Sequence, residues 1–147
     1  MAGTPGTQMS AFGSAAAAPV ACPCDPTRPY AACCGPLHVG ERLASTAEEL
    51  MRSRYSAFAV GDLDHLVRTW HPRTRPATLE RDPDPDERTE WVGLDVVSTD
   101  AGEVTAETGL VEFIAHWRRA GARGRQHEVS TFVRRAGRWV YVDGQCP

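Results

Sequence analysis

The chain contains no lysine and no asparagine, and all 16 of its basic residues are arginine. Without lysine it cannot form a Schiff base with a carbonyl substrate or with pyridoxal phosphate, and it cannot build the usual phosphate-binding loop. The motifs GxGxxG, GxSxG and HExxH are also absent. No apolar run approaches the roughly 18 residues that a membrane span needs. These absences exclude several common enzyme classes and argue against a membrane protein.

Charge and composition narrow the possible partners and the location. The formal net charge of −3 gives no general attraction to nucleic acid. Residues 1–21 are uncharged and consist mostly of Ala, Gly, Ser, Thr and Pro, so we predict a flexible tail there. A secretory signal would need a basic start and a Leu-rich core, and both are missing. We therefore expect a cytoplasmic protein.

Four of the five cysteines crowd together near the start of the chain, in the run CPCDPTRPYAACC that contains Cys22, Cys24, Cys33 and Cys34. Thiols at this density either bind a metal or form disulfides. Nothing in the sequence indicates an oxidising compartment, so we predict that all four bind one structural zinc ion as a closed tetrahedral set. Disulfides and thiol redox chemistry are the alternatives, and Cys146 is interpreted as a spare thiol.

The apolar pattern after this segment predicts two helices. Thr46 and Glu49 form a candidate capping box, and Leu50, Met51, Tyr55 and Phe58 fall on one helical face. Gly61 is suited to end the first helix, and Asp62 is suited to begin a second one that stops before Pro72. The run Arg52–Tyr55 is interpreted as a helix face that contacts the cysteine segment or solvent.

From residue 91 onward the apolar pattern alternates with a period of two, which is typical of strands. We predict strands over residues 91–98, 104–118, 125–135 and 138–143. Residues 72–89 read as a solvated acidic loop, because the DPDPDE run lacks the glycine and glutamate of a calcium loop. The fold class predicted is α+β, with helices packed on one face of a curved antiparallel four-strand sheet.

An ordered series of motifs resembles the YchJ-like family (uncharacterised protein family 0225). The motifs are CPC…PYAACCGPLHVGE, TAEELMRSRYSAFAVGD, TWHPRTRPATL, EWVGL, VEFIAHWR and HEVSTFVRRAGRWVYVDG. The resemblance implies a SEC-C zinc element over residues 22–40. It also implies a domain over residues 41–147 that is similar to nuclear transport factor 2 (NTF2), with a cystatin-like cone.

The cysteine segment departs from the usual SEC-C pattern at several positions. Asp25-Pro26 replaces the usual Gly-Ser, so one backbone donor to a sulfur is lost at Pro26. Ala31 and Ala32 replace the lysines through which the motif of the export ATPase SecA meets an acidic chaperone. That partner is therefore not carried over to this chain.

The cone implies a cavity between sheet and helices, and alternation predicts which residues face it. The candidates are Tyr55, Trp70, Trp117, Glu128, Ser130, Trp139, Tyr141 and Asp143. A carboxylate among aromatic rings, such as Glu128, can act as a general base, as in ketosteroid isomerases of this fold. The alternative is that these residues form a packed core in which Glu128 pairs with an arginine such as Arg134. His71 and His127 are further candidates. His116 and His127 are expected on the opposite sheet face.

Three functions follow from these features. The first is a zinc-stabilised adaptor that binds a protein partner through the zinc element, where Arg28, His38 and Arg42 are expected to be exposed. The second is a small-ligand binder or an enzyme that uses the cone. The third is a thiol redox sensor. Separately, the outer sheet face leaves open the possibility of a homodimer. An adaptor without catalytic activity is the leading hypothesis.

Overall fold

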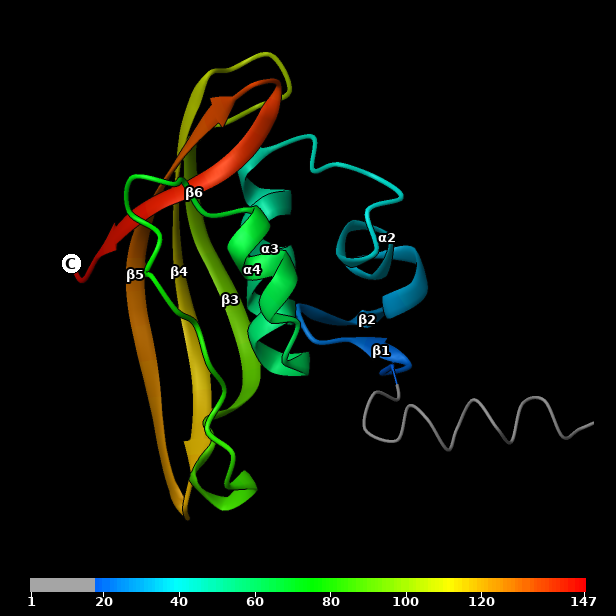
Figure 1. The fold of residues 1–147 in the computed structure, drawn as a ribbon, viewed down its shortest axis with the longest axis vertical. Coiled ribbons are helices and arrows are strands. Elements are labelled where there is room, and N and C mark those ends of the chain that lie inside the picture. The colour runs from blue at the N-terminus through cyan, green and yellow to red at the C-terminus, as the bar shows by residue number, and fades with distance from the viewer. Residues whose placement is uncertain (1–17) are drawn as a thin grey trace, which may run out of the picture.

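The computed structural model describes residues 18–147, and these form three layers (Figure 1). A four-strand antiparallel sheet makes the first layer, helices α3 and α4 cover one of its faces, and a small N-terminal element lies on the far side of α3. This arrangement confirms the predicted α+β class. The predicted flexible tail over residues 1–21 lies mostly outside the described residues.

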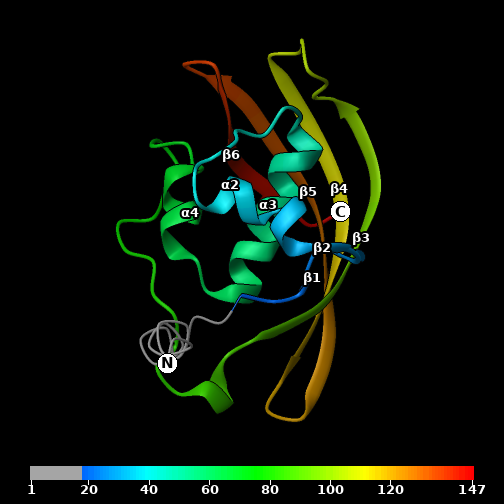
Figure 2. The same cartoon turned by 90° about the vertical axis from the view of Figure 1, so that its right-hand side faces the viewer.

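The N-terminal element is built from four short pieces. They are β1 (Ala21–Cys22), β2 (Asp25–Pro29), the 3-10 helix η2 (Tyr30–Ala32) and α2 (Gly35–His38). β1 and β2 pair as an antiparallel hairpin whose tight turn contains Pro23 and Cys24. In Figure 2 this element stands in front of α3, away from the sheet.

The first helix begins and ends at the residues that the sequence indicated. The second begins as indicated but ends at Arg68, before the predicted end at His71, because Trp70 already forms a β-bridge with Tyr141. α3 covers Ala47–Val60, and Thr46 caps it by accepting a hydrogen bond from the amide of Glu49 at 3.0 Å. The Glu49 carboxylate reaches back to the amide of Ser45 at 2.7 Å. Gly61 ends α3 with a left-handed φ of 80°, which glycine adopts without strain. The side chain of Asp62 then caps α4 (Leu63–Arg68).

The sheet has the strand order β3-β4-β5-β6, with each strand paired to its sequence neighbours. Its strands are β3 (Glu90–Ala101), β4 (Thr108–Arg119), β5 (Ala122–Arg135) and β6 (Arg138–Gln145). β5 begins earlier than predicted because Ala120 and Gly121, with φ of 49° and 84°, complete a two-residue hairpin turn. β4 begins later than predicted, because the Arg134 guanidinium donates hydrogen bonds to the carbonyls of Val104 and Ala106 and holds these residues in a loop.

An irregularity between β5 and β6 changes which side chains face the helices. Phe132 pairs with Tyr141, but Thr131 pairs with Asp143, so Val142 is an extra residue in β6. Such a bulge interrupts the period-two alternation. Tyr141 consequently points toward the helices, whereas Asp143 is exposed on the strand beyond the bulge.

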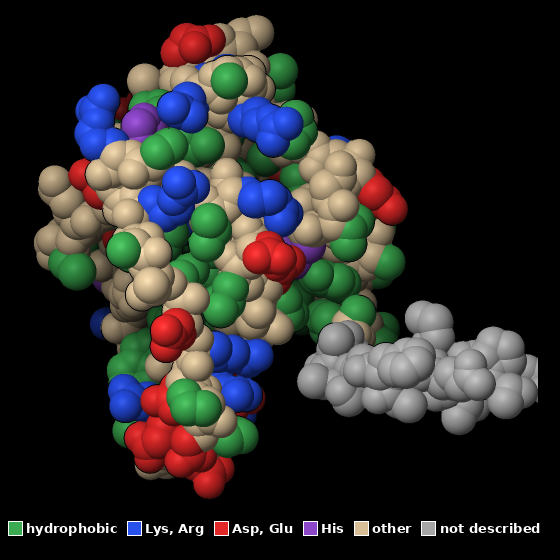
Figure 3. All heavy atoms as spheres, viewed as in Figure 1, with side chains coloured by type: hydrophobic (Ala, Val, Ile, Leu, Met, Phe, Trp, Pro, Cys, Tyr) green, Lys and Arg blue, Asp and Glu red, His purple; other side chains and the backbone are tan. Residues whose placement is uncertain are grey.

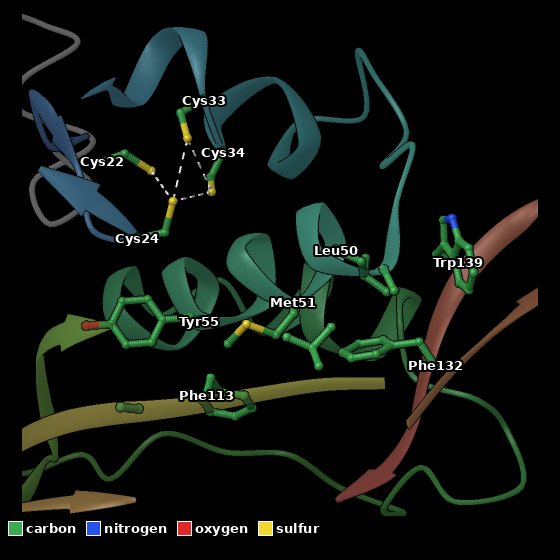
Figure 4. Packing of buried hydrophobic residues seen from close by; sticks show 13 residues of the cluster. Cys22, Cys24, Cys33, Cys34, Leu50, Met51, Tyr55, Phe113, Phe132 and Trp139 are labelled. Carbon is green, nitrogen blue, oxygen red and sulfur yellow. Dashed lines mark hydrogen bonds between the residues drawn. The ribbon is translucent and has the colours of Figure 1, made fainter. Parts of the chain in front are cut away.

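Helix α3 is buried on two opposite sides, as Figure 4 shows. The cysteines of the N-terminal element pack on one side, and Met51, Tyr55 and Phe113 pack between α3 and the sheet on the other. All belong to one continuous core cluster. Helix α3 therefore separates the cysteine cluster from the interior of the cone and contacts both.

The lower end of the molecule in Figure 3 is strongly acidic. This end carries the 3-10 helix η3 (Pro85–Glu87) and the exposed side chains of Asp82 and Asp84. The loop is therefore solvated, as its composition indicated. Within residues 18–147, no helix has both the length and the apolar character needed to cross a bilayer.

Candidate functional site

The four clustered cysteines point their sulfur atoms toward one centre (Figure 4). The Sγ of Cys24 lies 3.6 Å from those of Cys22 and Cys33 and 3.7 Å from that of Cys34. The Sγ atoms of Cys33 and Cys34 are 4.0 Å apart. Four sulfurs bound tetrahedrally to zinc at about 2.3 Å lie about 3.8 Å from one another. The donor set therefore fits a zinc ion.

The cluster contains no disulfide, since all four cysteines are free and their separations far exceed a sulfur–sulfur bond of about 2 Å. Each cysteine is also almost fully enclosed, with an exposed fraction between 1 and 6 %. The site is thus closed by the protein itself.

The protonation of the cluster depends on its internal hydrogen bonds. Hydrogen bonding with Cys24 and Cys34 lowers the pKa of Cys22 far below its usual range, despite burial. Hydrogen bonding with Cys22 raises the pKa of Cys24 to about 12, and it also raises the pKa of Cys34. These hydrogen bonds favour the thiolate at Cys22 and the protonated thiols at Cys24 and Cys34. A divalent metal would supply the positive charge that full deprotonation requires.

Side chains of α3 fasten the cysteine element to the rest of the molecule. Arg52 Nη1 donates to the carbonyl of Cys24 at 3.2 Å, and Ser56 Oγ lies 3.6 Å from Cys22 Sγ. From α4, Arg68 adds a further link, because its Nη2 donates to the carbonyl of His38 at 3.0 Å.

His38 itself is buried, which corrects the expectation that it is exposed. Its exposed fraction is 6 %. Nε2 donates to the carbonyl of Ser53 at 2.8 Å, so Nδ1 accepts from the hydroxyl of Tyr30 at 2.6 Å. His38 therefore joins the N-terminal element to α3 as a structural residue.

His65 extends this network from α4. Ser53 Oγ donates to the carbonyl of Leu50 and accepts from Nε2 of His65 at 2.9 Å. Burial, followed by the neighbouring His38, Arg68 and Arg54, lowers the pKa of His65 to about 3. The imidazole is thus held neutral inside the fold.

A second candidate site is a cavity of about 290 Å³ between α3 and the inner face of the sheet. Its walls are mainly aromatic. The lining residues are Met51, Arg54, Tyr55, Phe58, Trp70, Trp91, Phe113, Ala115, Gln126, Glu128, Ser130, Phe132 and Tyr141.

The structure brings together five of the eight residues predicted for this cavity, namely Tyr55, Trp70, Glu128, Ser130 and Tyr141. Trp117 shares their sheet face but lies further along β4, over Gly124. Trp139 is buried at the other end, where its Nε1 donates to the carbonyl of Ser45 at 3.1 Å. Asp143 faces outward because of the bulge in β6.

Glu128 is the carboxylate of the cavity wall. Its Oε2 accepts from Ser130 Oγ at 2.7 Å and from the Tyr141 hydroxyl at 3.3 Å, while its Oε1 accepts from Gln126 Nε2 at 2.8 Å. No described arginine pairs with it, and Arg134 instead bonds to loop carbonyls and stacks on Trp139. The carboxylate is therefore oriented by neutral donors.

Arg54 is the charged cavity residue that our sequence interpretation missed. It is 5 % exposed, and its guanidinium packs against the rings of Trp70 and Tyr141, at 4.7 and 4.5 Å from their centroids. Nη1 donates to the carbonyl of Leu66 and to Thr69 Oγ1. Burial lowers the pKa of Arg54 to about 10. The sequence feature that could have identified Arg54 as a cavity residue is its position on the apolar face of α3, three residues after Met51.

The remaining histidines lie outside the cavity. His116 and His127 sit on the outer sheet face, where their Nε2 atoms pair with Asp95 and Glu112 at 2.8 and 2.7 Å. His71 follows α4, and its Nδ1 accepts from the amide of Arg73. Nothing in these contacts points to catalysis.

The fold and the cysteine cluster together define an NTF2-like domain that carries a SEC-C element. The family model "YchJ, middle NTF2-like domain" matches residues 46–144, and the chain belongs to this YchJ-like family. A UPF0225 protein of Streptomyces coelicolor is 48% identical over 124 residues, which cover 84% of this chain and 94% of the relative. A UPF0225 protein of Bordetella parapertussis is 48% identical over 128 residues, covering 86% and 92%.

Two solved structures share the whole architecture. The solution structure of a SEC-C motif containing protein from Rhodopseudomonas palustris has a TM-score of 0.72 and 35% identity, covering 86% of this chain and 98% of that one. The crystal structure of a SEC-C motif containing protein from Psychrobacter arcticus has a TM-score of 0.65 and 27% identity, covering 86% and 82%.

The buried neutral His65 predicts acid sensitivity. An unfolded chain binds a proton at His65 near pH 6.5, whereas the folded chain resists protonation until about pH 3, so stability falls as pH drops below about 6.5. We expect the difference in unfolding free energy between wild type and His65→Gln to change by up to about 1.4 kcal/mol per pH unit in that range.

This expectation can be checked by urea unfolding of both proteins between pH 7.5 and about 5. Gln can still donate to Ser53 Oγ, and any acid-induced metal loss affects both proteins alike. A difference that is independent of pH would show that His65 is not held neutral.

Proposed function

We propose that Cys22, Cys24, Cys33 and Cys34 bind one structural zinc ion that clamps the N-terminal element onto α3. The observation that carries this proposal is the near-tetrahedral spacing of four enclosed sulfur atoms. Four protein ligands leave no open coordination position, so the ion would hold structure and would not bind substrate. The SEC-C motif named for the two similar solved structures supports the same interpretation.

Replacing Cys24 tests the zinc proposal most directly, because its sulfur lies within 3.7 Å of the other three. Purified wild type should contain about one zinc ion per chain, and Cys24→Ser should contain almost none and melt at a lower temperature. Elemental analysis and thermal unfolding measure both effects. Cys146→Ser is the matched control, since Cys146 is exposed and lies outside the cluster. Equal zinc content in wild type and Cys24→Ser would contradict the proposal.

A redox-sensing role has less support than a structural one. Reactive sensor cysteines are solvent-accessible, whereas these four have exposed fractions of 6 % or less.

The adaptor function rests on what the clamped element presents to solvent. Val39 and Leu43 are 70% and 54% exposed, and Arg28 is also exposed. Exposed apolar residues and arginine are both typical of protein-binding surfaces. We propose that a protein partner docks on this part of the chain through its exposed residues, which include Arg28, Val39 and Leu43.

The variant Val39→Ser/Leu43→Ser should lose this partner while its melting temperature stays nearly unchanged, because both residues are exposed. Affinity purification followed by cross-linking mass spectrometry should place wild-type cross-links within residues 28–43. Val92→Ser, which removes an exposed apolar side chain from the sheet, serves as the control. A partner that is recovered equally with both variants would not use this surface.

The second function is small-ligand binding in the cone. A largely apolar cavity with a few converging polar groups is the usual form of a ligand site. The arginine, the oriented carboxylate and the aromatic walls described above favour it.

Filling the cavity tests the ligand-binding function. Ala115 is 3% exposed and lines the cavity, so Ala115→Leu should occupy its space and weaken ligand binding at least tenfold with little loss of stability. NMR titration with a small-molecule library measures binding. Leu110→Phe adds bulk on the outer face of the same strand and should leave binding intact. Ligands that bind Ala115→Leu as tightly as wild type would place the site elsewhere.

A further inference from the structure

The charged groups of the cone cavity specify a class of ligand, and this inference rests on the proposed ligand-binding function. Arg54 is 5 % exposed, and a buried guanidinium normally pairs with an acid. Among residues 18–147, no acidic side chain forms an ion pair with it, and its hydrogen bonds use only Nη1. The rings of Trp70 and Tyr141 pack against the guanidinium at 4.7 and 4.5 Å from their centroids.

The edge of the guanidinium formed by Nε and Nη2 is left without a protein acceptor. In the described part of the chain, only the Tyr55 hydroxyl and Trp70 Nε1 are fully enclosed side-chain donors or acceptors that lack a partner. The Nε–Nη2 edge of Arg54 therefore keeps access to the cavity that this residue lines. That edge presents two parallel N–H groups, the geometry that binds a carboxylate through both of its oxygens.

Glu128 offers a complementary acceptor. A carboxylate has about four lone-pair sites, and Ser130, Tyr141 and Gln126 occupy three of them. Both sites on Oε2 are taken, so one site on Oε1 remains. Tyr141 connects the two charged groups, because its ring stacks on Arg54 and its hydroxyl contacts Glu128.

The size of the cavity limits the ligand. A volume of about 290 Å³ is at the lower end of the range of small-molecule pockets, so the cavity suits a small ligand. The walls of Phe58, Trp91 and Phe113 favour an apolar or aromatic body.

We propose that the cone binds a small organic acid with an apolar body and a hydroxyl or amino group beside its carboxylate. The carboxylate binds the Nε–Nη2 edge of Arg54, and the hydroxyl or amino group donates to Oε1 of Glu128. The aromatic walls enclose the body. Arg54 thereby gains a directly hydrogen-bonded anionic partner, which Glu128, acting on it only through its charge, does not provide.

Three matched probes test this assignment on the unaltered protein: 3-phenylpropionate, its amide, and 3-phenyllactate. NMR titration should show that the acid binds at least tenfold more tightly than the amide, because only the acid forms a charge-assisted pair with Arg54. 3-Phenyllactate should bind more tightly again, because its hydroxyl reaches Glu128.

Variants assign each contact to a residue. Arg54→Met should reduce the affinity for the acid to that for the amide. Glu128→Gln should remove most of the advantage of 3-phenyllactate and leave 3-phenylpropionate unchanged. Thr69→Val removes an acceptor of Nη1 only and should keep the preference for the acid, which makes it the matched control.

The outcomes separate this inference from the general ligand-binding function. Equal affinity for acid and amide in the wild type would overturn the organic-acid assignment while cavity binding would stand. An unchanged acid preference in Arg54→Met would also overturn it. If Arg54→Met fails to fold, the comparison of acid with amide on the wild-type protein still tests the organic-acid assignment. If no cavity residue shows a change in NMR chemical shift with millimolar probe, the organic-acid assignment is refuted.

Discussion

Helix α3 packs against the cysteine cluster on one side and the aromatic cavity on the other, and both candidate sites depend on this position. Arg52 and Ser56 face the cysteine element, whereas Met51 and Tyr55 face the sheet. A helix places residues three and four apart on the same face, so one stretch of sequence serves both layers. The fourteen residues Ala47–Val60 therefore fix the geometry of two sites that lie far apart in the sequence.

The sequence predicts best those features that are set by neighbouring residues. The caps of α3 and α4 are correct because Thr46 and Asp62 bond to amides only three residues ahead. The cysteine cluster was also predictable, since short spacing leaves few ways to arrange four sulfurs. In contrast, the outward position of Asp143 depends on one extra residue opposite β5, which period-two alternation cannot reveal.

Burial of polar residues is the feature that the sequence pattern conveys least. His38 was expected at the surface and Arg54 was assigned to a solvent or element-facing run, yet both are buried. In each case, partners distant in sequence compensate for the lost hydration. His38 bonds to the carbonyl of Ser53, and Arg54 packs against the rings of Trp70 and Tyr141. Composition alone therefore predicts exposure for such residues, because only the tertiary fold supplies their partners.

The two sites differ in what they leave open, and this difference assigns their roles. In the cysteine cluster, four enclosed sulfurs would satisfy a metal completely, so no position is left for substrate. In the cone, the edge of Arg54 and one lone pair of Glu128 have no partner among the described residues. Protein groups rarely stay unsatisfied in a largely buried position unless water or a ligand pairs with them. We therefore propose that the cone recognises a small molecule and that the proposed metal centre would keep α3 in the position that shapes the cone.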